Sequence, residues 1–386
     1  MSDLATARML MERLVNFPSV SRDSNLALID WVENWLVENG IEAVRVPDPT
    51  LPKASLYAHV GPSVAGGVVL SGHTDVVPVD GQVWTSDPWV VSERDGRFYG
   101  RGTCDMKGFD ALALAALVLA RKRGVKRPLQ VALSHDEELG CIGCIPLIEA
   151  MTGLPRASAV VVGEPSMMQA VTGHKGGLAF WVRMRGHEVH SSIMHTGVNA
   201  ILEATKLLGW VNEMNARGQA AVPSALAGRF NPPWTTVHCG QIKGGTAHNI
   251  TAGNCEFGVD FRIVPGEDPE AWRAAFMAQV AQVEAEMKAV HPDTGIEVTE
   301  RFTLPPLSPE TDGAAEALVR RLTGDNGRHV VSYGTEAGQF QVRGWSTVVC
   351  GPGDIAQAHQ ADEYLTTAQF QAGWAFMEQL IEGLCR

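Results

Sequence analysis

The sequence lacks any apolar run that approaches the roughly 20 residues needed to cross a bilayer. Its first residues, MSDLATARMLMERL, alternate charged and apolar positions and are typical of an amphipathic helix, not of a signal peptide. We also find no internal repeat and no low-complexity tract. These absences argue against a membrane protein or a repeat array, and we expect no membrane partner.

Positive charge is scarce. The chain has 31 Lys and Arg residues against 43 Asp and Glu residues, which gives a formal net charge of −12. An acidic surface repels the phosphates of nucleic acids and of anionic lipids. We therefore expect no nucleic acid partner.

Cysteine is too sparse for a disulfide framework. There are seven cysteines, an odd number, without a short Cys-rich pattern, so a reducing cytoplasm fits best. Cys141 and Cys144 form a CxxC unit, but no second pair accompanies them, and packing cysteines are expected. Cys104 would suit a thiol hydrolase, yet no base for it is identifiable, and its role stays open.

The 386 residues are long for one core and favour two or three domains. Apolar runs at 41–46, 54–60, 66–72, 129–138 and 158–166 predict strands, and the segments 3–17, 24–39 and 108–124 predict helices. Their alternation predicts an α/β fold with a mixed, largely parallel sheet. We assign residues 1–174 and 304–386 to this domain, with helices near 309–322 and 366–384 and a strand at 346–351.

A second domain is expected at 175–303, where the element order becomes β-α-β-β-α-β. This order is typical of a ferredoxin-like α+β sandwich with an antiparallel sheet. One of its helices follows DPEAW, in which Asp268 is placed as an N-cap and Pro269 as the first helical residue.

Polar clusters stand at the ends of the predicted strands. Sites in doubly wound sheets gather at the carboxyl ends of strands, so clusters at five strand ends indicate one common site. Each cluster has an ordinary alternative: a structural His–Asp hydrogen bond, an N-cap aspartate, or solvated surface acids. The clusters contain His73 and Asp75, Asp105, Glu137 and Glu138, Glu164, and His359.

The residue types in these clusters suit metal ions. A histidine ligand usually gives its second N–H to a carboxylate, as Asp75 could accept from His73. Adjacent acids such as Glu137 and Glu138 would repel at a buried strand end unless a cation neutralised one. Glu138 then suits a ligand and Glu137 a free base.

A charge count supports two divalent ions. They bring +4, and three carboxylate ligands bring −3, while His73 and His359 stay neutral; one bridging hydroxide closes the sum. Mixed histidine and carboxylate ligands suit zinc, with cobalt or manganese as substitutes. Two ions about 3.5–4 Å apart would generate a nucleophile at neutral pH and polarise a carbonyl group.

The motifs SGHTDVVP, GRGTCDMKG, DEELG, GEPS and GPG…AHQADEY resemble the aminoacylase/carboxypeptidase family of dinuclear zinc metallohydrolases. They occur in that family's order and span residues 71–364. The resemblance implies a metal-dependent amide hydrolase whose first ion is held by His73, Asp105 and Glu164. It implies that Asp105 bridges to a second ion held with Glu138 and His359. Asp75 would orient His73, Glu137 would be the general base and acid, and the Asp105–Met106 peptide would be cis.

The resemblance also implies that the second domain is a lid and the interface of a homodimer. His190 would reach the neighbouring subunit's site, and Asn249 and Arg262 would grip the substrate. Arg262 could equally pair with Asp260. We assign no role to His195 or His248, and a histidine at 248 departs from the family pattern.

The substrate implied is a small N-acyl amino acid. Within the family, YGTEAGQF at 333–340 resembles the deacetylases of an acetylated diamino acid, in which Glu336 would meet the substrate ammonium. A helix-start glutamate is the ordinary alternative. A desuccinylase, a broad acylase or dipeptidase, and a non-catalytic metal-binding protein stay open as other functions.

Overall fold

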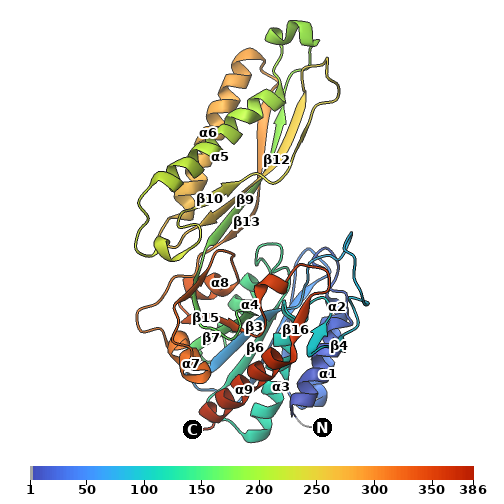
Figure 1. Cartoon of the computed structure of the whole chain (residues 1–386), viewed down its shortest axis with the longest axis vertical. Helices are drawn as coiled ribbons and strands as arrows, with labels where there is room; N and C mark the ends of the chain where they lie inside the picture. Colours follow the sequence, from blue (N-terminus) through green and yellow to red (C-terminus); the bar gives the residue numbers. More distant parts are fainter. Residues whose placement is uncertain (1–2) are drawn as a thin grey trace. The chain divides into compact units, whose positions relative to one another are not determined.

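The computed structural model describes residues 3–386 and divides into two compact units, which we treat separately (Figure 1). The large unit comprises the chain up to Gly173, Pro309–His329 and Thr335–Arg386. The inserted unit comprises His174–Ser308 and Val330–Gly334. None of the helices in residues 3–386 combines the length and the apolarity that a bilayer crossing requires.

The main sheet has eight strands in the order β1-β2-β6-β3-β7-β15-β8-β14. The four central strands β6, β3, β7 and β15 are parallel, whereas β1 and β2 on one side and β8 on the other are antiparallel to their neighbours. The expected α/β fold with a mixed, largely parallel sheet is thus confirmed. The strands are β1 (Ala43–Pro47), β2 (Ala54–Val60), β3 (Val68–His73), β6 (Leu129–Ser134), β7 (Ala159–Pro165), β8 (Val171–His174), β14 (His329–Val331) and β15 (Thr347–Gly351).

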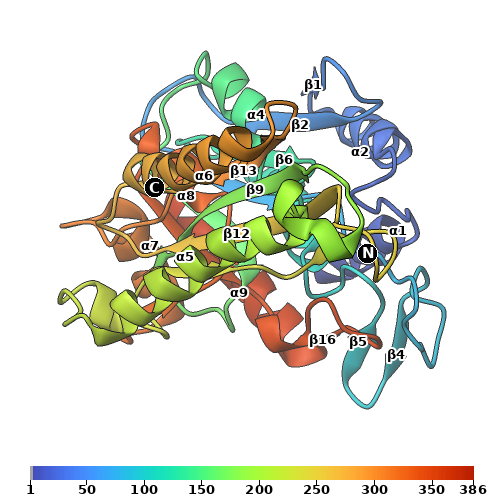
Figure 2. The same cartoon turned by 90° about the horizontal axis from the view of Figure 1, so that it is seen from above.

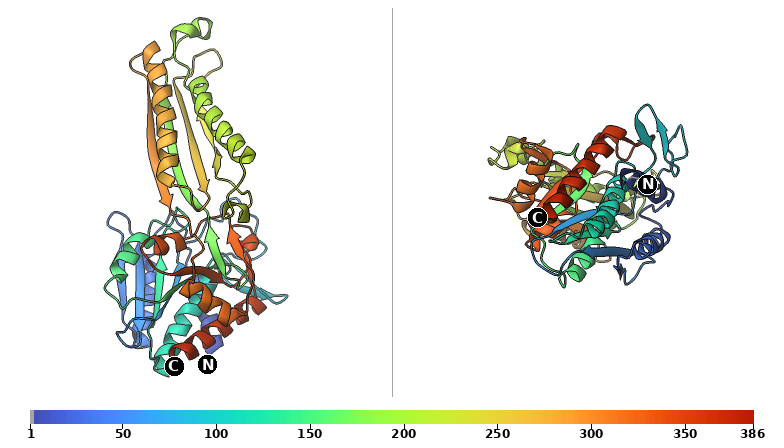
Figure 3. Two further views of the ribbon diagram at one scale, coloured as in Figure 1. Left: turned by 90° about the vertical axis from the view of Figure 1, so that its left-hand side faces the viewer. Right: turned by 90° about the horizontal axis from the view of Figure 1, so that it is seen from below.

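Helix α3 (Lys107–Arg123) forms the centre of the core. Its residues are buried from Lys107 to Ala120, because the run GFDALALAALVLA is apolar on almost every face. It lies against β2, β3, β6 and β7, and helices α1 (Asp3–Val15) and α9 (Thr367–Leu384) pack against it (Figure 3). The helix ends at Gly124, whose φ of 64° is the left-handed conformation that glycine adopts without a Cβ clash.

Further elements of the large unit are short or peripheral. Pattern reasoning missed most of them, since three-residue strands carry no readable periodicity. A three-stranded sheet has the order β16-β5-β4. These elements are α2 (Leu26–Glu38), β4 (Ser92–Arg94), β5 (Arg97–Tyr99), α4 (Cys144–Met151), α7 (Ala314–Thr323), α8 (Ala337–Val342), η3 (Ile355–Gln357) and β16 (Tyr364–Thr366).

The inserted unit is an antiparallel sheet in the order β10-β12-β9-β13, with β11 beside β12. Helices α5 and α6 lie next to each other over it (Figure 2). Asp268 caps α6 by accepting from the Glu270 N–H, and Pro269 is its first residue, as predicted. The elements are β9 (Gly176–Arg185), η1 (Ser191–Thr196), α5 (Ala200–Ala220), η2 (Ala227–Arg229), β10 (Thr236–His238), β11 (Ile242–Gly244), β12 (Asn254–Ile263), α6 (Pro269–Val290) and β13 (Gly295–Leu304).

The division differs in detail from the expected boundaries at 174/175 and 303/304. The inserted unit continues to Ser308, because His174 and Leu307 exchange both backbone hydrogen bonds, each of 3.1 Å. It also takes Val330–Gly334, where Val331 O accepts from the Lys175 N–H and Ser332 Oγ donates to Asn231 O. Pairing between residues far apart in sequence set these boundaries, and composition does not reveal such pairing.

Candidate metal centre

The carboxyl ends of three adjacent parallel strands bring the polar clusters together. His73 ends β3 and pairs in register with Ser134, which ends β6. The expected strand at 129–138 stops at Ser134, because Asp136 adopts a left-handed φ of 54° and turns the chain. That turn carries Glu137 and Glu138 to the same edge, and Glu164 stands near the end of β7, the other neighbour of β3.

Asp105 faces a histidine with each of its two oxygens. His73 Nε2 lies 3.1 Å from Oδ1, and His359 Nε2 lies 3.3 Å from Oδ2. His359 Nε2 is also 3.1 Å from Glu138 Oε1, and His73 Nε2 is 3.6 Å from Glu164 Oε1. The structure therefore brings the five expected ligand residues into one cluster, with Asp105 between two histidines. The groups whose ligand atoms all lie within 4.8 Å of one another are His73, Glu137 and Glu164, and His73, Asp105 and Glu138. The division of the expected ligands between two ions stays a prediction.

His73 is oriented differently from the expectation. Its Nδ1 lies 2.9 Å from the backbone carbonyl of Asp75 and 3.6 Å from the Asp75 carboxylate, so the N–H donates to the backbone. This fixes the tautomer and leaves Nε2 free for a cation. The Asp75 carboxylate instead accepts from the backbone N–H groups of Glu137 and Glu138 and from Ser21 Oγ. It therefore positions the acidic turn, a role that sequence spacing did not reveal.

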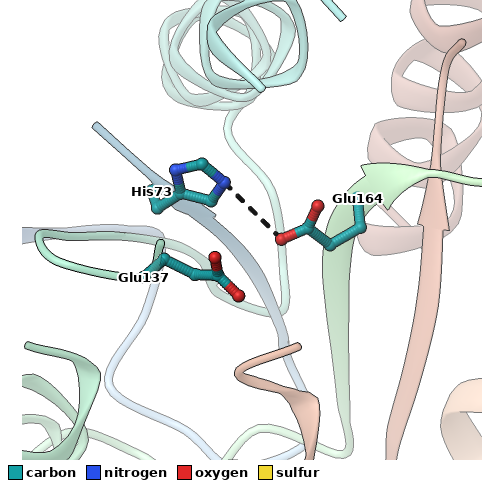
Figure 4. A group of neighbouring side chains, drawn as sticks. All are labelled: His73, Glu137 and Glu164. Atoms are coloured by element: carbon teal, nitrogen blue, oxygen red, sulfur yellow. Dashed lines mark ion pairs between the residues drawn. The ribbon is translucent and has the colours of Figure 1, made fainter. Parts of the chain in front are cut away.

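Glu137 lies close to the ligands and has a partner that we did not predict. Its carboxylate stands within 4.8 Å of the ligand atoms of His73 and Glu164, and the three side chains converge in Figure 4, where the dashed line joins His73 and Glu164. The Cys141 thiol donates to Glu137 Oε1 at 3.1 Å. The CxxC segment thus contributes a buried cysteine that holds the predicted base, rather than packing alone.

The electrostatics of the centre show a shortage of positive charge. Burial and the carboxylates of Asp105 and Glu137 raise the pKa of Glu164 well above its usual range. Burial raises the pKa of Glu138, and it raises the pKa of Glu137 to about 8. The hydrogen bonds that the His359 ring donates to Asp105 and Glu138 raise the pKa of His359 to about 10. Raised pKa values of both acids and a histidine are typical of a buried anionic cluster, because the carboxylates repel one another and attract a protonated imidazole.

The residues present fit divalent cations. Glu164 Oε1 is buried and has no hydrogen-bond partner among the described residues, although it faces His73. Such an orphaned oxygen is costly unless a cation or a donor satisfies it. The donor set of imidazole nitrogens and carboxylate oxygens is the one that zinc and its neighbours accept.

Glu336 contacts two of the strands that carry the centre. Its side chain is fully buried, and its oxygens accept from Ser71 Oγ at 2.5 Å and Ser134 Oγ at 2.8 Å. These serines stand on β3 and β6, so the carboxylate joins two of the strands that carry the centre. The contact of Glu336 with a substrate ammonium stays a prediction; in this structure its partners are the two serines.

The remaining candidates lie in the inserted unit. His190 is exposed, and its Nδ1 accepts from Ser192; Asn249 is also exposed, and its carbonyl accepts from the Ser191 N–H. Arg262 pairs with Asp260 on β12 at 2.9 Å, the alternative left open above. His195 and His248 are exposed.

Two further expectations concern the Asp105 segment. The Asp105–Met106 peptide is cis, as the family resemblance implied. Cys104 is buried, and burial raises the pKa of its thiol far above the usual value. The thiol donates to Asp354 O at 3.4 Å. A thiol that stays protonated cannot serve as a nucleophile, which disfavours the thiol-hydrolase alternative.

Comparison with known proteins agrees with this centre. The model of peptidase family M20/M25/M40 matches residues 69–383. The chain therefore belongs to this family of metal amidohydrolases, which confirms the resemblance seen in its motifs.

Individual proteins of the family are similar to this chain over almost its full length. An acetylornithine deacetylase from Myxococcus xanthus is 35% identical and aligns over 100% of this chain and 99% of that protein. One from Proteus mirabilis is 34% identical over 97% and 96%. Among solved structures, a family M20 metallo-carboxypeptidase from Sulfolobus solfataricus covers 97% of this chain and 98% of its own, with a TM-score of 0.79 at 15% identity. A dinuclear metal-binding M20 peptidase from Bacillus subtilis covers 99% of both chains, with a TM-score of 0.68 at 17% identity.

The shared carboxylate predicts the metal stoichiometry of a variant. Asp105→Ala removes a ligand from both sets at once, so we expect the protein to lose both metal ions. Metal analysis of the purified variant by mass spectrometry checks this. Asp95→Ala, which changes an exposed turn residue, should keep the wild-type content. Retention of one tightly bound ion by Asp105→Ala would show that the carboxylate does not bridge.

The hydrogen bond from the Cys141 thiol to Glu137 leads to a second prediction, which concerns turnover. Cys141→Ala removes the donor, and we expect kcat to fall about five- to tenfold, the size of one hydrogen bond, with KM and metal content unchanged. Cys141→Ser retains a donor and should recover most of the loss. Steady-state kinetics of both variants provide the measurement, and equal kcat values for the alanine and serine variants would contradict it.

Proposed function

We propose that the chain hydrolyses N2-acetyl-L-ornithine to acetate and L-ornithine, a step of arginine biosynthesis, with two zinc ions as cofactors. The observation that carries the proposal is Asp105 with one oxygen toward His73 and the other toward His359, beside the buried acid Glu137. The full-length relatives named acetylornithine deacetylase support this choice of substrate. Cobalt or manganese are the possible substitutes for zinc.

In this proposal, His73, Asp105 and Glu164 hold one ion, and Asp105, Glu138 and His359 hold the other. When bound, such ions acidify water and polarise a carbonyl group. Asp75 keeps His73 in the ligating tautomer through its backbone carbonyl, and it holds the turn of Glu137 and Glu138 through its carboxylate.

Glu137 moves the proton. Its carboxylate takes a proton from the water that attacks the amide carbonyl, and it later returns the proton to the departing amine. Burial raises its pKa to about 8, and nearby cations would lower this value toward neutrality. A group that must accept and release a proton in each cycle is most effective when its pKa lies near the working pH.

The inserted unit supplies the remaining substrate contacts in this proposal. Arg262 would exchange Asp260 for the substrate α-carboxylate, which a guanidinium grips with two hydrogen bonds. Asn249 would add a polar contact, and His190 would act near the oxyanion of the neighbouring subunit in a homodimer. Closure of this unit as a lid would exclude water. A reducing cytoplasm suits the seven cysteines, all of which are unpaired.

A substrate panel tests the proposed substrate. Metal-loaded protein should release amine from N2-acetyl-L-ornithine with a kcat/KM at least tenfold above that for N-succinyl-diaminopimelate or N-acetylmethionine. EDTA should abolish this release. Preference for the succinyl substrate would indicate a desuccinylase, and preference for N-acetylmethionine would indicate a broad acylase. No release from any member would leave a non-catalytic metal-binding protein.

Replacement of the base tests the mechanism. Glu137→Gln preserves the shape of the side chain but cannot take a proton, so we expect kcat to fall by about 10²–10⁴-fold. Metal content, measured in parallel, should remain that of the wild type because Glu137 is not a proposed ligand. Unchanged turnover would remove Glu137 from the mechanism, and loss of an ion would make it a ligand instead.

A further inference from the structure

Three loops of the large unit are linked by hydrogen bonds through two buried side chains outside the ligand sets, those of Glu363 and Arg101. We propose that Glu363, Arg101 and Gln82 form a positioning relay that sets the backbones of Asp105 and His359 and thereby controls metal affinity. We call these three residues the loop relay. The inference rests on the proposed metal centre and goes beyond it, because none of the three residues is a ligand.

Glu363 holds the segment that ends at Asp105. Its Oε1 accepts from the backbone N–H groups of Gly102, Cys104 and Asp105, each at 3.0 Å. These residues belong to an irregular stretch between β5 and α3, so no strand or helix pairs with their N–H groups. The backbone that carries the Asp105 carboxylate is therefore held by one acceptor on a loop 258 residues away in the sequence.

Arg101 links this acceptor to a third loop. Its Nη1 donates to Glu363 Oε2 at 2.6 Å, and its Nη2 donates to Gln82 Oε1 at 2.7 Å. The side chains of Arg101 and Glu363 are each 1% exposed. A buried, charge-assisted pair of this kind has little freedom to move, so it transmits position from one loop to the next.

Gln82 completes the relay at His359. Its Nε2 donates to the His359 carbonyl oxygen at 2.9 Å. His359 has a φ of 64°, a left-handed conformation that residues other than glycine rarely adopt without outside support. Its side chain is 52% exposed, so packing does not fix the ring. The backbone hydrogen bond from Gln82 therefore helps to set where this imidazole points, together with the contacts of its Nε2 to Asp105 and Glu138.

The two ends of the relay act on different ligands. Gln82 contacts the His359 loop, and His359 belongs only to the second ligand set. Glu363 contacts the Asp105 segment, and Asp105 belongs to both sets. Loss of the Gln82 donor should therefore lower the affinity for one ion, whereas loss of the Glu363 carboxylate should lower the affinity for both ions. A relay that merely stabilised the fold would not separate the two ions.

The experiment is a titration of metal-free protein with zinc against a competing chelator. Wild-type protein should bind two equivalents; failure to do so would refute the proposed metal centre itself and not the relay. Gln82→Glu retains the acceptor for Arg101 but loses the donor to His359. We expect this variant to bind one zinc equivalent about 10–100-fold more weakly, which is the usual effect of removing a group that orients a ligand. Its affinity for the other equivalent should stay within about twofold of wild type.

Two further variants complete the design. Gln360→Ala is the matched control: Gln360 stands beside His359, but its side chain donates within its own loop, to Ala356 O, so both affinities should stay within about twofold of wild type. Glu363→Gln should weaken both ions, with folding checked by circular dichroism. If Glu363→Gln does not fold, the zinc affinities of Gln82→Glu still test the proposal. Two wild-type affinities in Gln82→Glu would overturn the proposal.

Discussion

The repulsion among buried carboxylates is the constraint on which the centre depends. Asp105, Glu137, Glu138 and Glu164 converge around His73 at one edge of a sheet, and burial denies them the screening of water. Cations relieve this repulsion, and the unpartnered oxygen of Glu164 marks one place where a cation would fit. Binding of metal ions would therefore lower the electrostatic repulsion within the folded chain and stabilise it.

The parallel core explains why the carboxylates gather at one edge of the sheet. Strands β6, β3 and β7 run side by side in the same direction, so the residues that follow them meet at a common edge. Helix α3, buried along most of its length, holds the strands from one face. The helix starts two residues after Asp105, so the same element that completes the core also anchors the shared carboxylate.

Hydrogen bonds around the ligands give this centre its particular geometry. Asp75 fixes His73 by its backbone and the acidic turn by its side chain. Cys141 holds Glu137, and Ser71 and Ser134 hold Glu336. The strand ends bring the expected ligands together, whereas residues such as these hold the groups around them in place. They are therefore where members of one family with one fold can come to differ.

The sequence alone determined the parallel core, the order of elements in the inserted unit and the meeting of the polar strand-end clusters at one site, because motif spacing and apolar periodicity are local properties of the chain. It also determined the N-cap at Asp268. Tertiary structure decided the rest. The burial of Glu336, the contact of Gln82 with His359 and the limits of the inserted unit all join residues far apart in sequence. Such pairings depend on how the whole chain packs, and no local pattern records them.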